Sequence, residues 1–173
     1  MRSTKGFSLI ELLIVVAIIL IIAAIAIPNL LQAKIAANES SAAAALHTLH
    51  SAETTYYSAY PTVGYAAAIG DLGGVTPCTP SSTSACIIDS FLAIAIPGSS
   101  GKNGYFYLAT GLAPGGAPTN VAYVVGASPI NVHATGNRDF CSTNDGVLRS
   151  QNGNPGDTPV TTSGACFAFP VAQ

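Results

Sequence analysis

Gly6, Phe7 and Glu11 are the residues of this sequence whose types and spacing point most directly to a specific chemistry. An apolar run extends from Phe7 to Ile27, and one carboxylate, Glu11, interrupts it near its start. Because an ionised group in an apolar layer costs a few kcal/mol, such a group usually marks a function and has a partner. Peptide cleavage after Gly6 would retain the apolar run and create an amine on Phe7, about one helical turn from Glu11. The spacing therefore favours proteolytic processing followed by ion pairing of a carboxylate with an amine.

The order of these signals differs from that of an ordinary secretory leader. In a secretory leader the small-residue cleavage site follows the apolar run, and the run is discarded. Here the basic residues Arg2 and Lys5 are followed by Gly6, and the apolar run comes afterwards. We therefore expect the apolar helix to remain in the mature protein.

A basic leader, the Gly6-Phe7 junction and Glu11 together resemble the prepilin signal of type IV pilins and pseudopilins. The family motif is matched residue by residue in Gly6-Phe7-Ser8-Leu9-Ile10-Glu11-Leu12. A close resemblance extends from Arg2 to about Tyr60. It implies that residues 1–6 are a leader removed by a prepilin peptidase, that Phe7 is then N-methylated, and that Glu11 serves recognition between subunits. Pro28 stands where pilins commonly carry a helix-weakening proline, although Leu12 to Ile27 lacks the glycine that many pilins have there.

The same segment predicts one long helix in two parts. Residues 7–28 form the hydrophobic part, which spans a membrane or lies in a filament core, and residues 29–61 form an amphipathic part. Apolar residues at three- and four-residue spacings form a stripe that should pack on the rest of the protein: Leu46, Leu49, Tyr56 and Tyr60. Asn38-Glu39-Ser40 matches a glycosylation acceptor, but within a helix we interpret it as solvated surface. Tyr60-Pro61 should end the helix.

Residues 62–173 read as a loop-rich head with a small antiparallel sheet, which gives an α+β, pilin-like fold. Ile87 to Ile96 is a candidate short helix, and Tyr105 to Thr110 and Val121 to Ala127 are candidate strands. A hairpin is expected from Asp139–Ser142 and Val147–Ser150, because Asn144-Asp145-Gly146 between them is a turn signal.

All four cysteines lie outside the apolar run. An even number of cysteines beyond a membrane anchor indicates disulfides in an oxidising compartment. Of the three connectivities, we favour Cys78–Cys86 and Cys141–Cys166, because each pair closes a polar loop. The second bridge should pin the C-terminal segment to the sheet edge, with help from Phe167 and Phe169.

Two other groups of residues could bind a metal, and we favour neither. His47, His50 and Glu53 share one helix but lack the spacing of a known zinc motif and a fourth ligand. Oxygen ligands for calcium could come from a second group that has no EF-hand spacing: Asp139, Asn144, Asp145 and Asp157. We therefore expect no metal or other cofactor. Because the chain contains few acids, bases and histidines, an enzyme is a weak candidate.

Charge limits the partners of the mature chain. Without the leader, four Lys and Arg stand against eight Asp and Glu, a net charge of 4 − 8 = −4, so no general attraction to nucleic acid is expected.

The resemblance implies a structural subunit of a type IV pilus, stored in the inner membrane and polymerised with its own copies into a surface filament by the inner-membrane assembly machinery. Such filaments serve adhesion, motility or DNA uptake. The alternatives are a pseudopilin of a type II secretion system and a membrane-anchored envelope enzyme or binding module.

Overall fold

The structure, a computed structural model, describes residues 6–172 and divides into two compact units. The first unit ends at Lys34, and its described part consists of residues 6–8 without regular structure followed by a single stretch of helix. The second unit, from Ile35 onwards, contains a sheet and the remaining helices. Arg2 and Lys5 of the expected leader lie outside the described residues.

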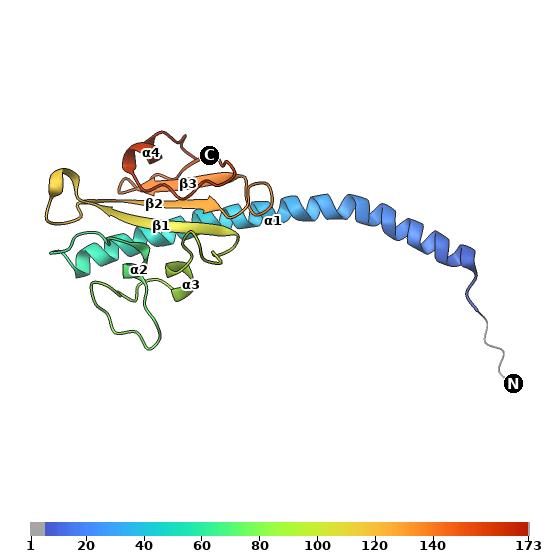
Figure 1. The fold of residues 1–173 in the computed structure, drawn as a ribbon, viewed down its shortest axis with the longest axis horizontal. Coiled ribbons are helices and arrows are strands. Elements are labelled where there is room, and N and C mark those ends of the chain that lie inside the picture. Colours follow the sequence, from blue (N-terminus) through green and yellow to red (C-terminus); the bar gives the residue numbers. More distant parts are fainter. Residues whose placement is uncertain (1–5, 173) are drawn as a thin grey trace. The chain divides into compact units, whose positions relative to one another are not determined.

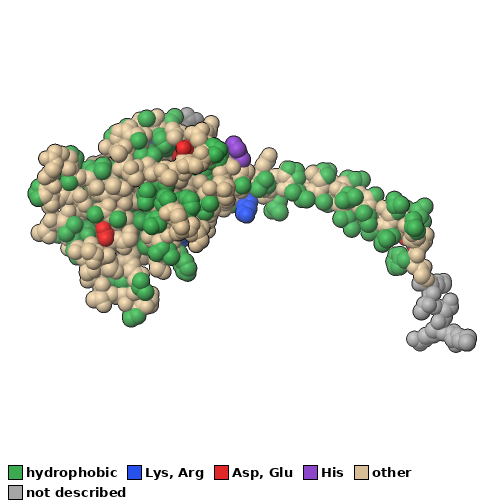
Figure 2. Space-filling view, in the orientation of Figure 1, with side chains coloured by type: hydrophobic (Ala, Val, Ile, Leu, Met, Phe, Trp, Pro, Cys, Tyr) green, Lys and Arg blue, Asp and Glu red, His purple; other side chains and the backbone are tan. Residues whose placement is uncertain are grey.

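Helix α1 extends from Leu9 to Ala59 and includes Pro28. It ends immediately before Tyr60-Pro61, which confirms the predicted helix end. In the first unit the large side chains from Phe7 to Leu31 are apolar and exposed, and Figure 2 shows them on one face. Among the described residues, α1 is the one helix long and apolar enough to cross a membrane. This is the pattern of a helix that must be covered by lipid or by other helices.

The second unit is an α+β fold, as predicted, with an antiparallel sheet in the order β1-β2-β3-β4 (Figure 1). The strands are β1 (Tyr105–Leu112), β2 (Ala122–Pro129), β3 (Arg138–Thr143) and β4 (Arg149–Asn152). Short helices α2 (Ile69–Leu72) and α3 (Ser90–Ala93) interrupt the long connection after α1. A 3₁₀ turn, η1 (Pro114–Gly116), follows β1, and α4 (Ser163–Phe167) lies near the C-terminus.

The main core lies between one face of the sheet and the second half of α1. Leu46, Leu49 and Tyr56 of the predicted stripe are fully buried there, whereas Tyr60 is half-buried. The sheet contributes alternate residues of its strands to this core: Tyr105, Tyr107, Val125, Ala127 and Phe140. The helical period of the stripe and the two-residue period of the strands thus meet in one core.

A smaller apolar cluster covers the opposite face of the sheet. It contains Val124, Cys141, Cys166 and Phe169. Cys141 belongs to the interior strand β3, so its disulfide to Cys166 attaches α4 to the face of the sheet and not to its edge, which corrects the expectation. Phe169 is buried as expected, but Phe167 is 56 % exposed and lies under the Arg149 guanidinium.

The predicted hairpin is confirmed, with a longer loop than expected. β3 pairs with β4 through Cys141 opposite Arg149, so β4 begins two residues later than the sequence suggested. The residues between the strands form a tight turn in which Gly146, at a φ of 70°, donates its N–H to the Thr143 carbonyl at 2.9 Å. A polar network centred on Asp145, described below, occupies the rest of the loop.

Candidate assembly site

Glu11 lies in the first turn of α1 and is exposed. Its Oε2 accepts a hydrogen bond from the Ser8 N–H at 2.9 Å, and the Ser8 carbonyl accepts from the Leu12 N–H at 3.3 Å. A carboxylate at this position satisfies one of the free amides of a helix N-terminus and is stabilised by the helix dipole. The carboxylate is therefore held at the start of the helix and keeps the capacity to accept further hydrogen bonds.

Ser8 is a helix-capping residue that the sequence reasoning overlooked. A Ser followed three residues later by Glu, just before an apolar run, is the sequence pattern of a capping box. Ser8 and Glu11 have this spacing, and the hydrogen bond that the Ser8 amide donates to the Glu11 carboxylate is one of the two that define the box. The pattern could have predicted where α1 begins.

The Gly6-Phe7 junction precedes the helix and is open. Gly6 and Phe7 have no regular secondary structure, and Phe7 is 87 % exposed. A methyl group added to Gly6 would meet no atom within 4 Å. Cleavage of this accessible peptide bond would leave α1 intact.

Apolar side chains surround Glu11 on the helix surface. One face of the first turns forms a shallow groove lined by Leu9, Leu12, Leu13, Val16, Ala17 and Leu20. An ion pair formed on such a surface and then covered by apolar neighbours would be desolvated, and its strength would depend on exact pairing. Pro28 lies within the same helix and has no N–H to donate. The kink expected there stays a prediction.

In the head, a second carboxylate fixes α1 to the loop before β3. Glu39 is 8 % exposed; its Oε1 accepts from the Asn137 N–H and its Oε2 from Arg138 Nε, both at 2.8 Å. The Asn38 amide donates to the Thr135 carbonyl at 2.8 Å. The interpretation of Asn38-Glu39-Ser40 as solvated surface was therefore wrong for its first two residues, because their partners come from a segment about a hundred residues later in the chain.

Glu53 is a third carboxylate on α1 and is completely buried. Its Oε2 accepts from the Ala66 N–H at 2.9 Å, and its Oε1 has no hydrogen-bond partner among the described residues. Burial, reinforced by the negative charge of Asp71, raises the pKa of Glu53 to about 7. This carboxylate holds the chain after α1 against the helix.

The residues considered for a metal on α1 have separate partners. His50 Nδ1 makes a short hydrogen bond with the Tyr123 hydroxyl, Glu53 binds Ala66, and His47 is exposed. Within residues 6–172 no cluster of three His, Cys, Asp or Glu could hold a metal ion. His50 and Glu53 thus serve as contacts between α1 and the rest of the head.

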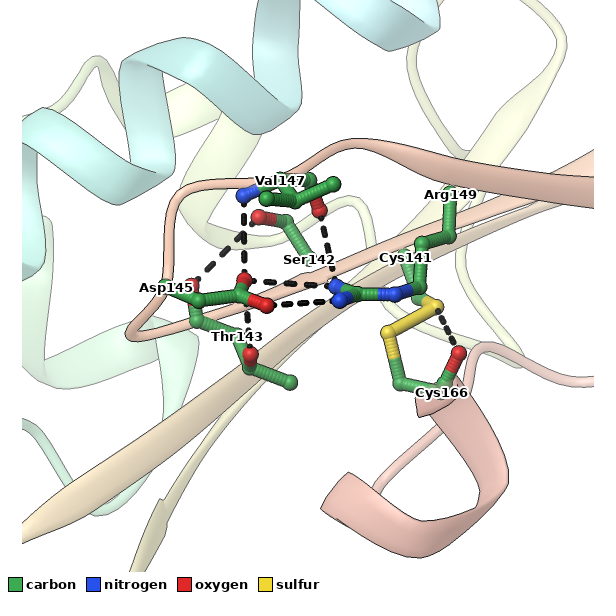
Figure 3. Close-up of polar contacts among 7 residues, drawn as sticks. All are labelled: Cys141, Ser142, Thr143, Asp145, Val147, Arg149 and Cys166. Carbon is green, nitrogen blue, oxygen red and sulfur yellow. Dashed lines mark hydrogen bonds and ion pairs between the residues drawn. A yellow bond between two sulfur atoms is a disulfide. The ribbon is translucent and has the colours of Figure 1, made fainter. Parts of the chain in front are cut away.

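The acidic residues near Cys141 also separate into two places. Asp145 binds Arg149 Nη2 through Oδ2 at 2.6 Å, while its Oδ1 accepts from the Thr143 hydroxyl and the Val147 N–H (Figure 3). These bonds, the one from Arg149 above all, lower the pKa of Asp145 below its usual range. Asp139 is buried on β3 and Asp157 binds Asn154 in the segment after β4, so among the described residues the four oxygen residues do not converge on one point.

The structure joins Cys78 to Cys86 and Cys141 to Cys166, the two pairs favoured by the sequence (Figure 3 shows the second). Cys141 and Cys166 are fully buried. The first pair closes an exposed loop, whose Ser82 carbonyl accepts a hydrogen bond from the buried Tyr56 hydroxyl at 2.5 Å.

An apolar helix with one carboxylate in its first turn, followed by an α+β head with α1 packed on its sheet, defines a pilin-like protein. Comparison with known proteins agrees. Residues 1–27 match the family model of the prokaryotic N-terminal methylation motif. The chain is 60 % identical over 47 residues to the type IV wide pilus major component PilA4 of Thermus thermophilus, which covers 27 % of this chain and 36 % of that protein. It is 48 % identical over 54 residues to the type IV major pilin protein PilA of Myxococcus xanthus, covering 31 % of this chain and 24 % of that protein.

These similarities confirm the resemblance to type IV pilins and support a pilus subunit. The matched segments span about a third or less of the length of the curated relatives. No solved structure matches the chain. Both relatives are named as major pilus components, and the matched segments cover less than a third of this chain.

One prediction concerns Glu53 and the pH dependence of stability. Since its pKa is about 4.5 as a free group and about 7 in the fold, ionising it opposes folding. The loss of folding free energy due to Glu53 is negligible below pH 4.5, grows as the pH rises from 4.5 to 7, and reaches its full size above pH 7. By linkage, Glu53 alone should make the head less stable at pH 8 than at pH 5, by up to about 3 kcal/mol.

The variant Glu53→Gln keeps an oxygen for the Ala66 amide and has no charge to bury. Urea unfolding at pH 5 and pH 8 should show a smaller loss of stability with rising pH in this variant than in the wild type. Glu53→Gln unfolding with the full wild-type pH dependence would show that Glu53 is not the group responsible.

Proposed function

We propose that this protein is a structural subunit of a type IV pilus filament. In this proposal residues 1–6 are a leader removed by a prepilin peptidase, and Phe7 becomes the N-methylated N-terminus. Residues 7–28 are the membrane and filament-core segment, 29–61 the amphipathic helix, and 62–173 the head. The observation that carries the proposal is the exposed carboxylate of Glu11 in an otherwise apolar helix, directly after an accessible Gly6-Phe7 junction.

The exposed apolar surface of the first unit supports storage in the inner membrane and later assembly. Large apolar side chains from Phe7 to Leu31 are between 45 % and 87 % exposed. Such a surface needs lipid or neighbouring apolar helices to cover it. The same helix could be covered by lipid in the inner membrane and by copies of itself after polymerisation, which the inner-membrane assembly machinery would drive.

Glu11 would give the assembly its register. In the filament its carboxylate would pair with the Phe7 amine of a neighbouring subunit. A subunit that docked out of register would leave both charges unpaired in an apolar core, where each is costly. The Ser8 amide holds the carboxylate in place before that partner arrives.

The charges of the head support a role in filament contacts over electrostatic binding of polyanions. Within residues 6–172, Lys102 pairs with Asp89 at 2.8 Å, Arg138 with Glu39, and Arg149 with Asp145. Three of the four cations of the mature chain are therefore already neutralised. Of the roles that the family resemblance implies, namely adhesion, motility and DNA uptake, non-specific DNA binding through this head is the least favoured by its charge.

Shearing filaments from cells and identifying their main protein tests this proposal. We expect this chain to be present in sheared filaments and the filaments to be lost when its gene is deleted. Recovery of the protein only in the membrane fraction, with filaments unchanged after deletion, would contradict it.

A further inference from the structure

Asp139 is a buried carboxyl that the assembly site does not use. It belongs to β3, is 4 % exposed, and its Oδ1 has no hydrogen-bond partner among the described residues. Its side chain lies on the face that also bears Cys141, because the two residues are two apart on one strand. Buried polar atoms without partners are rare in proteins and call for an explanation.

The segment between β4 and α4 covers this carboxyl. The backbone passes so closely that a methyl group on Gly153 would lie 3.2 Å from Asp139 Oδ1, and the Gly153 N–H donates to the Asn137 carbonyl at 2.9 Å. Further along, a Cβ on Gly126 of β2 would lie 2.7 Å from the Val160 nitrogen. Residues 153–160 therefore form a strap laid directly on β2 and β3.

The strap carries a second carboxyl, Asp157, to Asp139. Asp157 Oδ2 accepts from the Asn154 N–H at 2.7 Å and from its side-chain amide at 3.2 Å, so Asp157 is fixed within its own turn. Its carboxyl lies within hydrogen-bonding reach of Asp139. Two carboxyls in contact cannot both ionise cheaply, and one proton shared between them makes a strong hydrogen bond.

Among the described residues, Lys102, Arg138 and Arg149 are paired with Asp89, Glu39 and Asp145, and not with these two carboxyls. Gln151 of β4 contributes an amide, and Ser128 of β2, which the register places beside Asp139, contributes a buried hydroxyl that also lacks a partner. The Arg138 guanidinium binds Glu39 on the other face of the sheet, so it does not reach Asp139. The Tyr105 phenol, on that same other face, donates to the Arg138 carbonyl and is likewise not a partner of Asp139. Burial, with the Asp157 carboxyl as the next cause, raises the pKa of Asp139 to about 7.

We propose that Asp139 and Asp157 form a proton-dependent clasp, which holds the 153–160 strap on the sheet when the pair carries one proton and releases it when that proton is lost. Below neutral pH one carboxyl donates to the other. As the pH rises through neutrality the shared proton passes to solvent, and two negative charges face each other in a buried site. The movement is local, because the strap is bounded by β4 at Asn152 and by the Cys141–Cys166 disulfide.

Hydrogen exchange of the full chain in detergent micelles tests the clasp, with rates corrected for the intrinsic effect of pH. Amides of the strap, among them Gly153, Asn154 and Asp157, should lose about tenfold or more of their protection between pH 5.5 and pH 8.5. In Asp139→Asn the amide can donate to Asp157 at any pH, so protection should be the same at both. Asp157→Asn removes the charge repulsion by replacing the other carboxyl of the pair, so strap protection in this variant should also be the same at both pH values.

Glu53→Gln is the matched control, because it removes another buried carboxyl with a raised pKa, on α1, which packs on the opposite face of the sheet. It should leave the pH response of the strap as in the wild type. Protection that does not change with pH in the wild type, or that falls equally in both Asn variants, would overturn the proposal. So would full protection at pH 8.5 on adding calcium alone, which would show that the pair binds a cation and not a shared proton.

Discussion

Replacing Glu11 by Ala is expected to abolish or sharply reduce filament growth while membrane insertion and folding of the head persist. Insertion should persist because the substitution makes the apolar segment more apolar. Assembly should fail because the Phe7 amine of each neighbour loses its partner in an apolar core, where breaking a buried pair costs about 3–5 kcal/mol. That penalty corresponds to roughly a hundredfold or more in the equilibrium of each subunit addition. Electron microscopy and the ratio of filament protein to membrane protein measure it.

Glu11→Gln separates the charge from the capping contact. Glutamine can still accept a hydrogen bond from the Ser8 amide, as Glu11 does at 2.9 Å, but it cannot form an ion pair. We expect the Gln variant to be nearly as defective as the Ala variant. Filaments of normal number and length in Glu11→Ala would show that Glu11 is only an interfacial charge. Normal filaments in Glu11→Gln alone would assign Glu11 to helix capping.

Removing the Cys141–Cys166 bridge is expected to cost the head about 2–4 kcal/mol of unfolding free energy. The bridge spans 25 residues and ties α4 to β3, and both cysteines are fully buried, so we would use the double variant Cys141→Ala/Cys166→Ala. A loss of this size is a large share of the stability of a small domain. Urea unfolding of the oxidised protein measures it.

The Cys78–Cys86 bridge supplies the matched control. Its separation is 8 residues, so it restricts the unfolded chain less, and Cys78→Ala/Cys86→Ala should lose less stability. Peptide mapping without reduction should recover Cys141 joined to Cys166. Recovery of Cys141 joined to Cys78 or Cys86 would contradict the pairing, and an equal loss in the two double variants would contradict the argument from loop length.

The sequence predicted those parts of the fold that depend on local patterns. The helix end at Tyr60-Pro61 depends on proline, the buried Leu46, Leu49 and Tyr56 on the helical period, and the β3–β4 hairpin on the turn around Gly146. Each of these signals lies within a few residues of the feature it predicts. The late start of β4 was missed because the hydrogen bonds that the Asp145 carboxylate accepts extend the loop.

The buried carboxylates could not be predicted in the same way. Glu39 reads as a surface residue from its polar neighbours, yet its partners Asn137 and Arg138 are about a hundred residues further along the chain. Glu53 was considered as a metal ligand because of the nearby histidines, and only the fold shows that it accepts from Ala66. Contacts between distant segments depend on tertiary packing, and a polar residue has no periodic signal that reveals its burial.

The intact mass of the subunit in sheared filaments tests the central claim most directly. The claim predicts a chain that has lost Met1 to Gly6, begins at Phe7 and carries one additional methyl group on the Phe7 amine. The membrane pool should contain the same processed form, with unprocessed chain accumulating only when the prepilin peptidase is absent. Filaments built from the full-length chain, or a mature chain that begins beyond Ile27, would contradict the account.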